Sequence, residues 1–239
     1  MKLEKIILWL DRTLKVASFD DVSNNGLQVG RSEGKGQWPE VKTVAFAVDA
    51  SVKAVEQAAK AGAQLLVVHH GISWGGGIKR VTGGVGNVIR AALKHNLAIA
   101  AFHLPLDAHP VLGNNAQLAK LLGLKKIKKA FSYHGNVIGL VGSVGSARSV
   151  GVGGRIISVP RGMIGVCSGG AGEFAEEAKA LGCDLYVTGE ASWGEVIAAE
   201  NCGMKMICAG HYETEVFGVR ALAKAMKKAL KLRTVDLTK

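Results

Sequence analysis

The pattern of apolar and polar positions along the chain predicts alternating strands and helices. Short aliphatic runs, typical of buried strands, cover residues 44–48, 65–68, 97–102, 163–166, 184–187 and 205–208. Between them apolar residues recur at helical spacing, and the predicted helices cover residues 2–16, 51–61, 85–95, 114–122, 172–181, 192–201 and 212–230. Ser51 is the predicted N-cap of its helix. This alternation is typical of an α/β protein with mostly parallel, helix-covered sheets.

The stretch from about 124 to 160 interrupts this rhythm, because Gly and Ser punctuate short β-like runs there. We therefore predict two α/β domains, residues 1–127 and residues 128–239. Whether the last helix packs back on the first domain stays open. Residues 23–30 are rich in Asn and Gly, which favour turns and positive φ, so a loop is predicted there.

Composition excludes several classes of protein. The first helix mixes charges among its apolar residues and is followed by no small-residue cleavage site, so it is not a signal peptide. No apolar stretch approaches the roughly 20 residues that a membrane span requires. The four cysteines form no C-x-x-C pair, which indicates reduced, mostly buried thiols. We therefore expect a cytoplasmic protein without membrane contact.

The chain is basic, with 30 Lys+Arg against 19 Asp+Glu, a formal charge of +11 and a pI near 9.6. Nucleic acid, an anionic small molecule or a basic solvated surface would each explain this excess. The positive residues concentrate at Lys125, Lys126, Lys128 and Lys129 and along the last helix, at Lys224, Lys227, Lys228, Lys231 and Arg233. Neither stretch contains the interleaved aromatics that stack on bases, so a solvated face is the simpler interpretation.

Potential metal ligands follow three of the predicted strands, where the crevice of an open α/β sheet lies. His69 and His70 end the run at 65–68, and Gly71 would relax the backbone so that both face one cleft. His103 and Asp107 follow the next strand. His211 and Glu215 share one face at the start of the last helix. Imidazole and carboxylate ligands suit Zn, Fe, Ni or Mn. Each motif alone is also compatible with ordinary structural residues, but their joint occurrence favours a metal site.

Two further features are candidates for substrate contacts. Ser168, Gly169 and Gly170 lie between a predicted strand and a predicted helix, where backbone N–H groups bind anions; a plain tight turn is the alternative. Glu190 ends another predicted strand and is a candidate general base, or else a structural carboxylate.

Several motifs together resemble one known family over nearly the whole chain. They are Asn24-Asn25-Gly26-Leu27-Gln28-Val29-Gly30, His69-His70-Gly71, the stretch from His103 through Asp107 and His109 to Asn114-Asn115, Thr188-Gly189-Glu190, and the stretch from Gly210 through His211 and Tyr212 to Glu215. The combination resembles the Nif-three-like dinuclear-metal-centre family, whose bacterial members are often labelled GTP cyclohydrolase I type 2 homologues. The chain is similar to its short form, without the large central insertion.

The resemblance implies two α/β domains that face a metal-containing cleft, two divalent metal ions per chain (Fe, Zn, Mn or Ni) and a homo-oligomer, commonly a ring-shaped hexamer. By residue-to-residue match the metal ligands are His69, His70, Asp107, His211 and Glu215, and the carboxylates are bridges. His103 would sit beside the site and support the ligands or act as an occasional ligand. Independently of the resemblance, Glu190 and His103 are our candidate catalytic residues. The sequence departs from the family pattern at Ser23, where an acidic residue is common, and at Gly71, where Pro is common.

Three functions are compatible with these features. The first is a metal-dependent hydrolase of a nucleotide-like or phosphorylated substrate, with a GTP cyclohydrolase-like activity implied only by the resemblance. The second is a non-catalytic protein for metal delivery, storage or regulation, since ligands fix coordination but not turnover. The third is nucleic-acid binding, which rests on charge alone and predicts a strong salt dependence.

Overall fold

The computed structural model describes residues 1–30 and 40–238, and it divides the chain into two compact units. The first unit combines Met1–Leu106 with Val219–Lys239, and the second comprises Asp107–Gly218. The first unit is therefore discontinuous in sequence. Within the described residues, no helix combines the length and the apolar character needed to cross a membrane.

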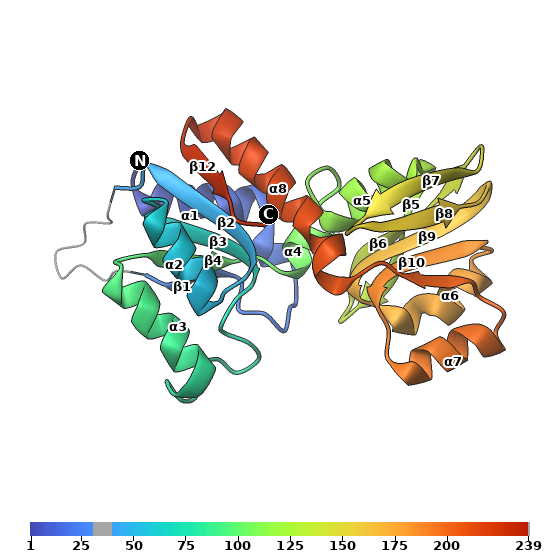
Figure 1. Ribbon diagram of the computed structural model, residues 1–239, viewed down its shortest axis with the longest axis horizontal. Helices are drawn as coiled ribbons and strands as arrows, with labels where there is room; N and C mark the ends of the chain where they lie inside the picture. The colour runs from blue at the N-terminus through green and yellow to red at the C-terminus, as the bar shows by residue number, and fades with distance from the viewer. Residues whose placement is uncertain (31–39, 239) are drawn as a thin grey trace. The chain divides into compact units, whose positions relative to one another are not determined.

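The first unit is a five-stranded sheet covered by helices on both faces (Figure 1). Its strand order is β1-β4-β3-β2-β12, with β1 antiparallel to β4 and the other neighbours parallel. The elements are α1 (Leu3–Leu14), the 3₁₀ turn η1 (Val16–Ser18), β1 (Gly26–Val29), β2 (Thr43–Asp49), α2 (Val52–Lys60), β3 (Leu65–His70), α3 (Gly83–Lys94), β4 (Ala98–Ala101), β12 (Arg233–Asp236) and the later part of α8 (His211–Leu230).

The predicted aliphatic runs form the centre of this sheet because both of its faces are covered. Ala45, Leu66 and Ile99 belong to the buried cluster that includes residues of α2 and α3, and Figure 1 shows α1 on the other face. Ser51 caps α2 as predicted, since its hydroxyl accepts the N–H of Ala54 at 3.1 Å.

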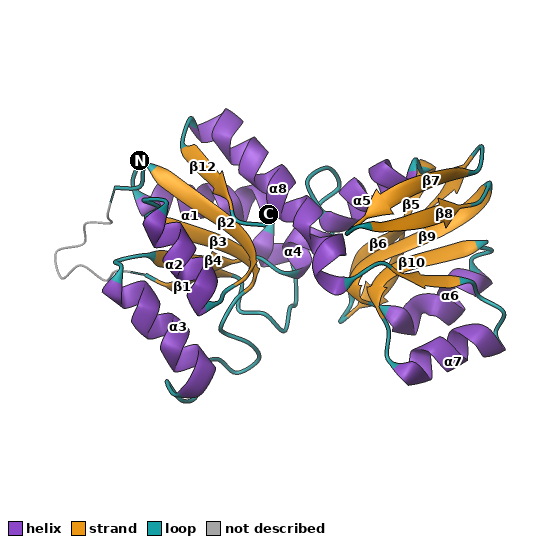
Figure 2. Cartoon of the chain, viewed as in Figure 1, coloured by secondary structure: helices purple, strands orange, loops and turns teal. Residues whose placement is uncertain are grey.

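The second unit is also α/β, but its sheet is mixed (Figure 2). The strand order is β11-β10-β9-β6-β5, in which β11, β10 and β9 are parallel and β6 and β5 are antiparallel to their neighbours; β7 and β8 form a separate hairpin. The short helix α4 (Leu104–Asp107) ends the first part of the first unit, and its last residue, Asp107, is the first of the second unit. The other elements of the second unit are α5 (Asn114–Leu122), β5 (Lys125–Tyr133), β6 (Asn136–Val144), β7 (Arg148–Val152), β8 (Arg155–Val159), β9 (Gly162–Gly170), the 3₁₀ turn η2 (Gly172–Phe174), α6 (Ala175–Ala180), β10 (Leu185–Glu190), α7 (Trp193–Asn201), β11 (Met206–Cys208) and the start of α8.

Each face of this second sheet has its own apolar layer. Leu118 and Leu122 of α5 belong to one buried cluster with Ile157 of the β7–β8 hairpin, while Figures 1 and 2 show α6 and α7 on the opposite face. On that opposite side Phe131 stacks on Phe174, with ring centroids 5.6 Å apart. A helix-and-hairpin layer and a two-helix layer thus enclose the sheet.

The structure differs from the predicted organisation in three places. The predicted boundary near 127 falls inside β5. The helix α5, which lies before that boundary in the sequence, packs against β6 and β9 and belongs with the second unit. Asp107 consequently belongs to the second unit. Gly26–Val29 is a strand and not a loop, since it pairs with β4 as an antiparallel edge.

Candidate metal centre

His69 and His70 are the last two residues of β3, inside the strand and not beyond its end as predicted. His69 is fully buried, and its Nδ1 lies 2.9 Å from the carbonyl oxygen of Phe102. Nδ1 of His70 lies 2.9 Å from Oδ1 of Asp49. Because both partners are oxygen acceptors, the rings carry their proton on Nδ1, which leaves the lone pair on Nε2 for a metal.

Gly71 was expected to relax the backbone so that His69 and His70 face one cleft, and this explanation is wrong. The strand continues to His70, and the two imidazole centroids nevertheless lie 4.5 Å apart. Gly71 is needed for a different reason, because a Cβ there would collide with the side chain of Gln28. Oε1 of Gln28 accepts the N–H groups of Ile72 at 2.7 Å and Ser73 at 3.2 Å, so this close approach fixes the loop after the strand.

His103 follows β4 and is oriented by a residue that the sequence analysis missed, Asp21. Oδ1 of Asp21 lies 2.9 Å from Nδ1 of His103, and its Oδ2 accepts the N–H of Leu104 at 2.9 Å and the amide of Asn25 at 2.8 Å. Burial alone would raise the pKa of Asp21, but the hydrogen bonds and the charge of His103 lower it to about 2, with help from Asn25 and Ser23.

His69, His70 and His103 form one cluster in the first unit. Their potential ligand atoms all lie within 4.8 Å of one another. The indole of Trp74 flanks the cluster, with its ring centroid 5.1 Å from that of His103, and its Nε1 donates to the carbonyl of Gly71 at 3.0 Å. Three imidazoles at this spacing can hold a divalent cation.

In the second unit, Asp107 presents a buried carboxylate at the end of α4. Its Oδ1 accepts the amide of Asn114 at 2.8 Å and the hydroxyl of Ser168 at 3.2 Å. Asn114 in turn accepts the backbone N–H of Gly218 at 2.7 Å. These contacts fix the orientation of the carboxylate.

His211 and Glu215 face each other across the first turn of α8, as their spacing predicted. Nε2 of His211 lies 3.2 Å from Oε1 of Glu215, whose side chain is 4% exposed. Nδ1 of His211 lies 2.9 Å from Oε1 of Glu190. The hydrogen bond to Glu215 is the main cause that raises the pKa of His211 to about 9; burial opposes it, and Glu190 adds to it. A metal cation can replace the proton that Nε2 of His211 shares with the buried carboxylate of Glu215.

The predicted strand-to-helix turn at Ser168, Gly169 and Gly170 is wrong, because all three residues belong to β9. The N–H of Ser168 donates to Asn115 at 2.7 Å, and that of Gly169 donates to Thr214 at 3.0 Å. These two N–H groups are therefore engaged within the second unit. A Cβ on Gly169 would lie 2.5 Å from Oε1 of Glu215, so this glycine makes room for the predicted ligand.

The donor set fits a divalent metal. Each of the four histidines in question holds an oxygen atom at Nδ1, from Phe102, Asp49, Asp21 or Glu190. This arrangement, in which an oxygen fixes the tautomer and the ring orientation, is typical of histidines that bind metals. The sequence pattern predicts these histidines as candidate ligands. It does not predict Asp49 or Asp21 as their partners, since neither lies at a recognisable spacing from a histidine.

Comparison with known proteins agrees with these features. The model of the Duf34/NIF3 (NGG1p interacting factor 3) family matches residues 1–238. The chain belongs to the DUF34/NIF3 family. This confirms the resemblance drawn from the motifs, and the family name covers both units.

Curated NIF3 relatives and solved NIF3-like structures match along almost the entire chain. A protein of Pyrococcus horikoshii is 39% identical over 98% of this chain and 97% of its own length, and one of Archaeoglobus fulgidus is 39% identical over 99% and 98%. Both are called GTP cyclohydrolase 1 type 2 homolog. A structural-genomics protein called ybgI, of unknown function, matches with a TM-score of 0.83 at 28% identity over 99% of this chain and 98% of its own. TTHA1606 of Thermus thermophilus matches with a TM-score of 0.76 at 28% identity over 99% and 98%.

Proposed function

We propose that this NIF3-family chain binds two divalent metal ions through His69, His70, Asp107, His211 and Glu215 and hydrolyses a phosphorylated, nucleotide-like substrate. The observation that carries the proposal is the oxygen acceptor at Nδ1 of each of these histidines. The name GTP cyclohydrolase 1 type 2 homolog, borne by the relatives, supports hydrolysis of a nucleotide.

The proposed roles follow from the environment of each side chain. Phe102, Asp49 and Glu190 accept from Nδ1 of the three imidazoles and would so direct each Nε2 to a metal ion. The carboxylates of Asp107 and Glu215 have two oxygens each and could bridge a pair of ions. Bound divalent ions would supply Lewis-acid activation for the attack of water on the substrate.

His103 is the residue we assign to proton transfer. Its Nδ1 is held by Asp21, whose pKa of about 2 keeps it an acceptor at neutral pH. Nε2 can then accept a proton from water and release it to a leaving group. Glu190 is assigned a positioning role toward His211 in place of the predicted general base. The indole of Trp74 beside His103 offers an aromatic surface to a planar base.

The experiment starts from chain stripped of metal with a chelator and reconstituted anaerobically with Zn²⁺, Mn²⁺, Fe²⁺ or Ni²⁺. Metal content by mass spectrometry is expected to approach two ions per chain, and hydrolysis of GTP and simpler phosphorylated compounds is then measured. Asp107→Ala and Glu215→Gln should lose both the ions and the turnover. Glu200→Gln, which changes an exposed carboxylate on α7, is the matched control.

Each possible result decides a part of the proposal. Fewer than one ion per chain after reconstitution would refute the metal centre. Turnover that survives in Asp107→Ala would refute metal-dependent catalysis. Two ions without turnover of any tested phosphorylated compound would favour metal delivery, storage or regulation. We also propose the ring-shaped homohexamer and cytoplasmic residence expected from the sequence, the first of which light scattering tests directly.

A further inference from the structure

A cavity of about 270 Å³ lies within the second unit, next to Asp107. It is bounded by the segment 107–110, the first turn of α5 and the β5–β6 hairpin. Its lining residues are Asp107, Ala108, His109, Pro110, Asn115, Ala116, Ile127, Lys129, Val137, Ile138, Gly139 and Leu140. The volume is just below the range of drug-sized sites, which begins at about 300 Å³. It suits a small organic molecule.

The walls of the cavity are largely apolar, and the register of the hairpin explains why. Lys129 of β5 pairs with Leu140 of β6, so these two side chains share one face of the sheet. Ile127 lies two residues before Lys129 on the same strand and is 46% exposed, and Val137 is 40% exposed. Apolar side chains that stay open to solvent around a concavity are typical of a binding site.

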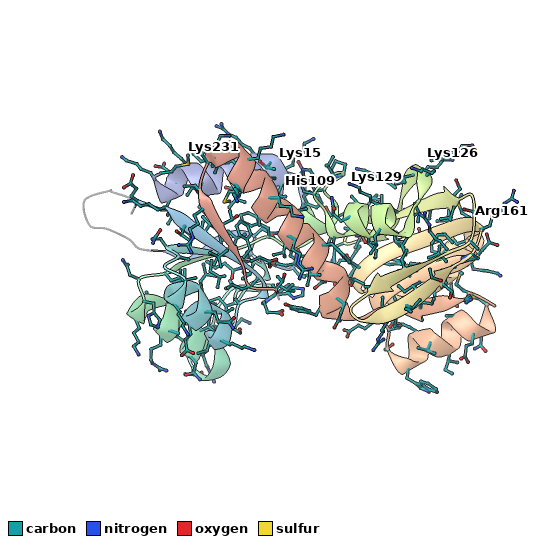
Figure 3. All side chains as sticks on the ribbon, turned by 45° about the horizontal axis from the view of Figure 1, so that its top comes forward. Lys15, His109, Lys126, Lys129, Arg161 and Lys231 are labelled. Atoms are coloured by element: carbon teal, nitrogen blue, oxygen red, sulfur yellow. The ribbon has the colours of Figure 1, made fainter. Side chains whose placement is uncertain are left out.

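The polar groups of the cavity are few and of defined character. Nδ1 of His109 accepts the backbone N–H groups of Val111 at 3.1 Å and Leu112 at 2.9 Å, so its proton is on Nε2. Lys129 adds an ammonium group, and Figure 3 labels both side chains on the segments that border the cavity. The amide of Asn115 is engaged by Ile138 and by Ser168 and so serves the fold.

We propose that this cavity binds a small organic monocarboxylate with an apolar body. The carboxylate would face the ammonium group of Lys129, whose N–H donors match the carboxylate oxygens. The apolar body would lie against Ala116, Ile127 and Leu140. The buried carboxylate of Asp107 lines the same cavity and would repel a second negative group, which favours a monoanion over a phosphate dianion. No part of this proposal requires a metal ion.

The probe is 4-fluorobenzoate, whose ¹⁹F signal is followed during titration of the full chain, with 4-fluorobenzamide as its neutral counterpart. The carboxylate should bind, and the amide should bind at least tenfold more weakly, because the pairing with Lys129 is lost. Lys129→Gln should weaken carboxylate binding by about tenfold, and Ala116→Leu should abolish it by filling the cavity.

Lys128→Gln is the matched control, since Lys128 is the adjacent exposed lysine of β5, pairs with Val141 and does not line the cavity. It should change the affinity by less than twofold. Equal binding of acid and amide, or equal losses in the Lys128 and Lys129 variants, would overturn the proposal. So would the absence of binding at millimolar concentrations.

A carboxylate could also bind to a metal ion, so the titration is repeated on metal-stripped chain and on His69→Ala/His70→Ala. Binding should persist in both. Its loss with the metal would place the probe at the metal ligands and overturn the cavity proposal. Persistence in a chain that never takes up metal would support the cavity even if the proposed metal function failed. Light scattering shows whether the chain assembles during the titration. Release of the probe on assembly would assign this face to a contact between copies of the chain and would also overturn the cavity proposal.

Discussion

At the scale of single residues, the most informative groups are the acceptors behind the histidines. The histidines themselves could be predicted, because they follow recognisable strands and a helix start. Asp21 could not, since it meets His103 across 82 positions of sequence, and no local pattern encodes that encounter. Candidate ligands are thus visible in a sequence, whereas the groups that orient them depend on tertiary structure.

Asp49→Ala tests the importance of such an acceptor. Without the carboxylate at 2.9 Å, the imidazole of His70 loses its fixed orientation, and we expect metal affinity to fall about 10- to 100-fold. Competition against a chromophoric chelator measures this change. Glu56→Ala, on an exposed position of α2, should bind as the unaltered chain does. An unchanged affinity of Asp49→Ala would show that Asp49 does not orient a metal ligand.

The cysteines give a second prediction at this scale. Burial raises the pKa of the Cys167 thiol well above its usual range and that of Cys183 to about 11. Because the thiolate is the reactive form, neither should be alkylated at pH 8 in the folded chain. Cys202 is partly exposed and should react first. Mass spectrometry after brief iodoacetamide treatment measures the order, and alkylation of Cys167 at the rate of Cys202 would contradict it.

At the scale of elements, β5 explains much of the charge that the sequence left open. Residues Lys125–Lys129 are exposed on the edge strand of the second sheet, and a bulge interrupts its register between Lys125 and Lys128. Lysines and bulges protect sheet edges from pairing with other chains. The lysine run therefore has an explanation that requires no nucleic acid. Nucleic-acid binding through these lysines would make the affinity for DNA or RNA strongly dependent on salt. An affinity that is independent of salt would contradict it.

The β7–β8 hairpin carries a prediction of its own. Its turn places Gly153 and Gly154 at φ 54° and 77°, as a type I′ turn requires. A Cβ on Gly153 would collide with the side chain of Glu213 in α8, whereas a Cβ on Gly154 would meet open space. Gly154→Ala should therefore cost about 1 kcal/mol from backbone strain alone, and Gly153→Ala about 1–2 kcal/mol more from overpacking.

Chemical denaturation of both variants measures this difference in the free energy of unfolding. Glu213→Ala introduced with Gly153→Ala should restore most of the additional loss, because it removes the colliding side chain. Equal costs for the two glycine variants would mean that the hairpin does not pack on α8 in solution.

At the scale of the whole molecule, the α/β class could be predicted from the repeated strand and helix patterns, but the division into units could not. A pattern read along the chain favours consecutive domains. The first unit is completed by the C-terminal residues, where β12 pairs in parallel with β2. The mixed character of the second sheet escaped prediction for a similar reason, since strand direction follows from pairing and not from composition.

Removal of residues 219–239 tests this discontinuous organisation. The truncated chain loses β12, so β2 becomes an edge strand, and it loses Leu222 and Met226, which are fully buried. Hydrogen exchange measured by mass spectrometry should show faster exchange in β2 and β3 of the first unit, while β9 and β10 of the second unit keep their protection. If the chain were instead organised as consecutive domains, β9 and β10 would be the strands to lose protection. The strands in which hydrogen exchange becomes faster therefore decide between a discontinuous first unit and two consecutive domains.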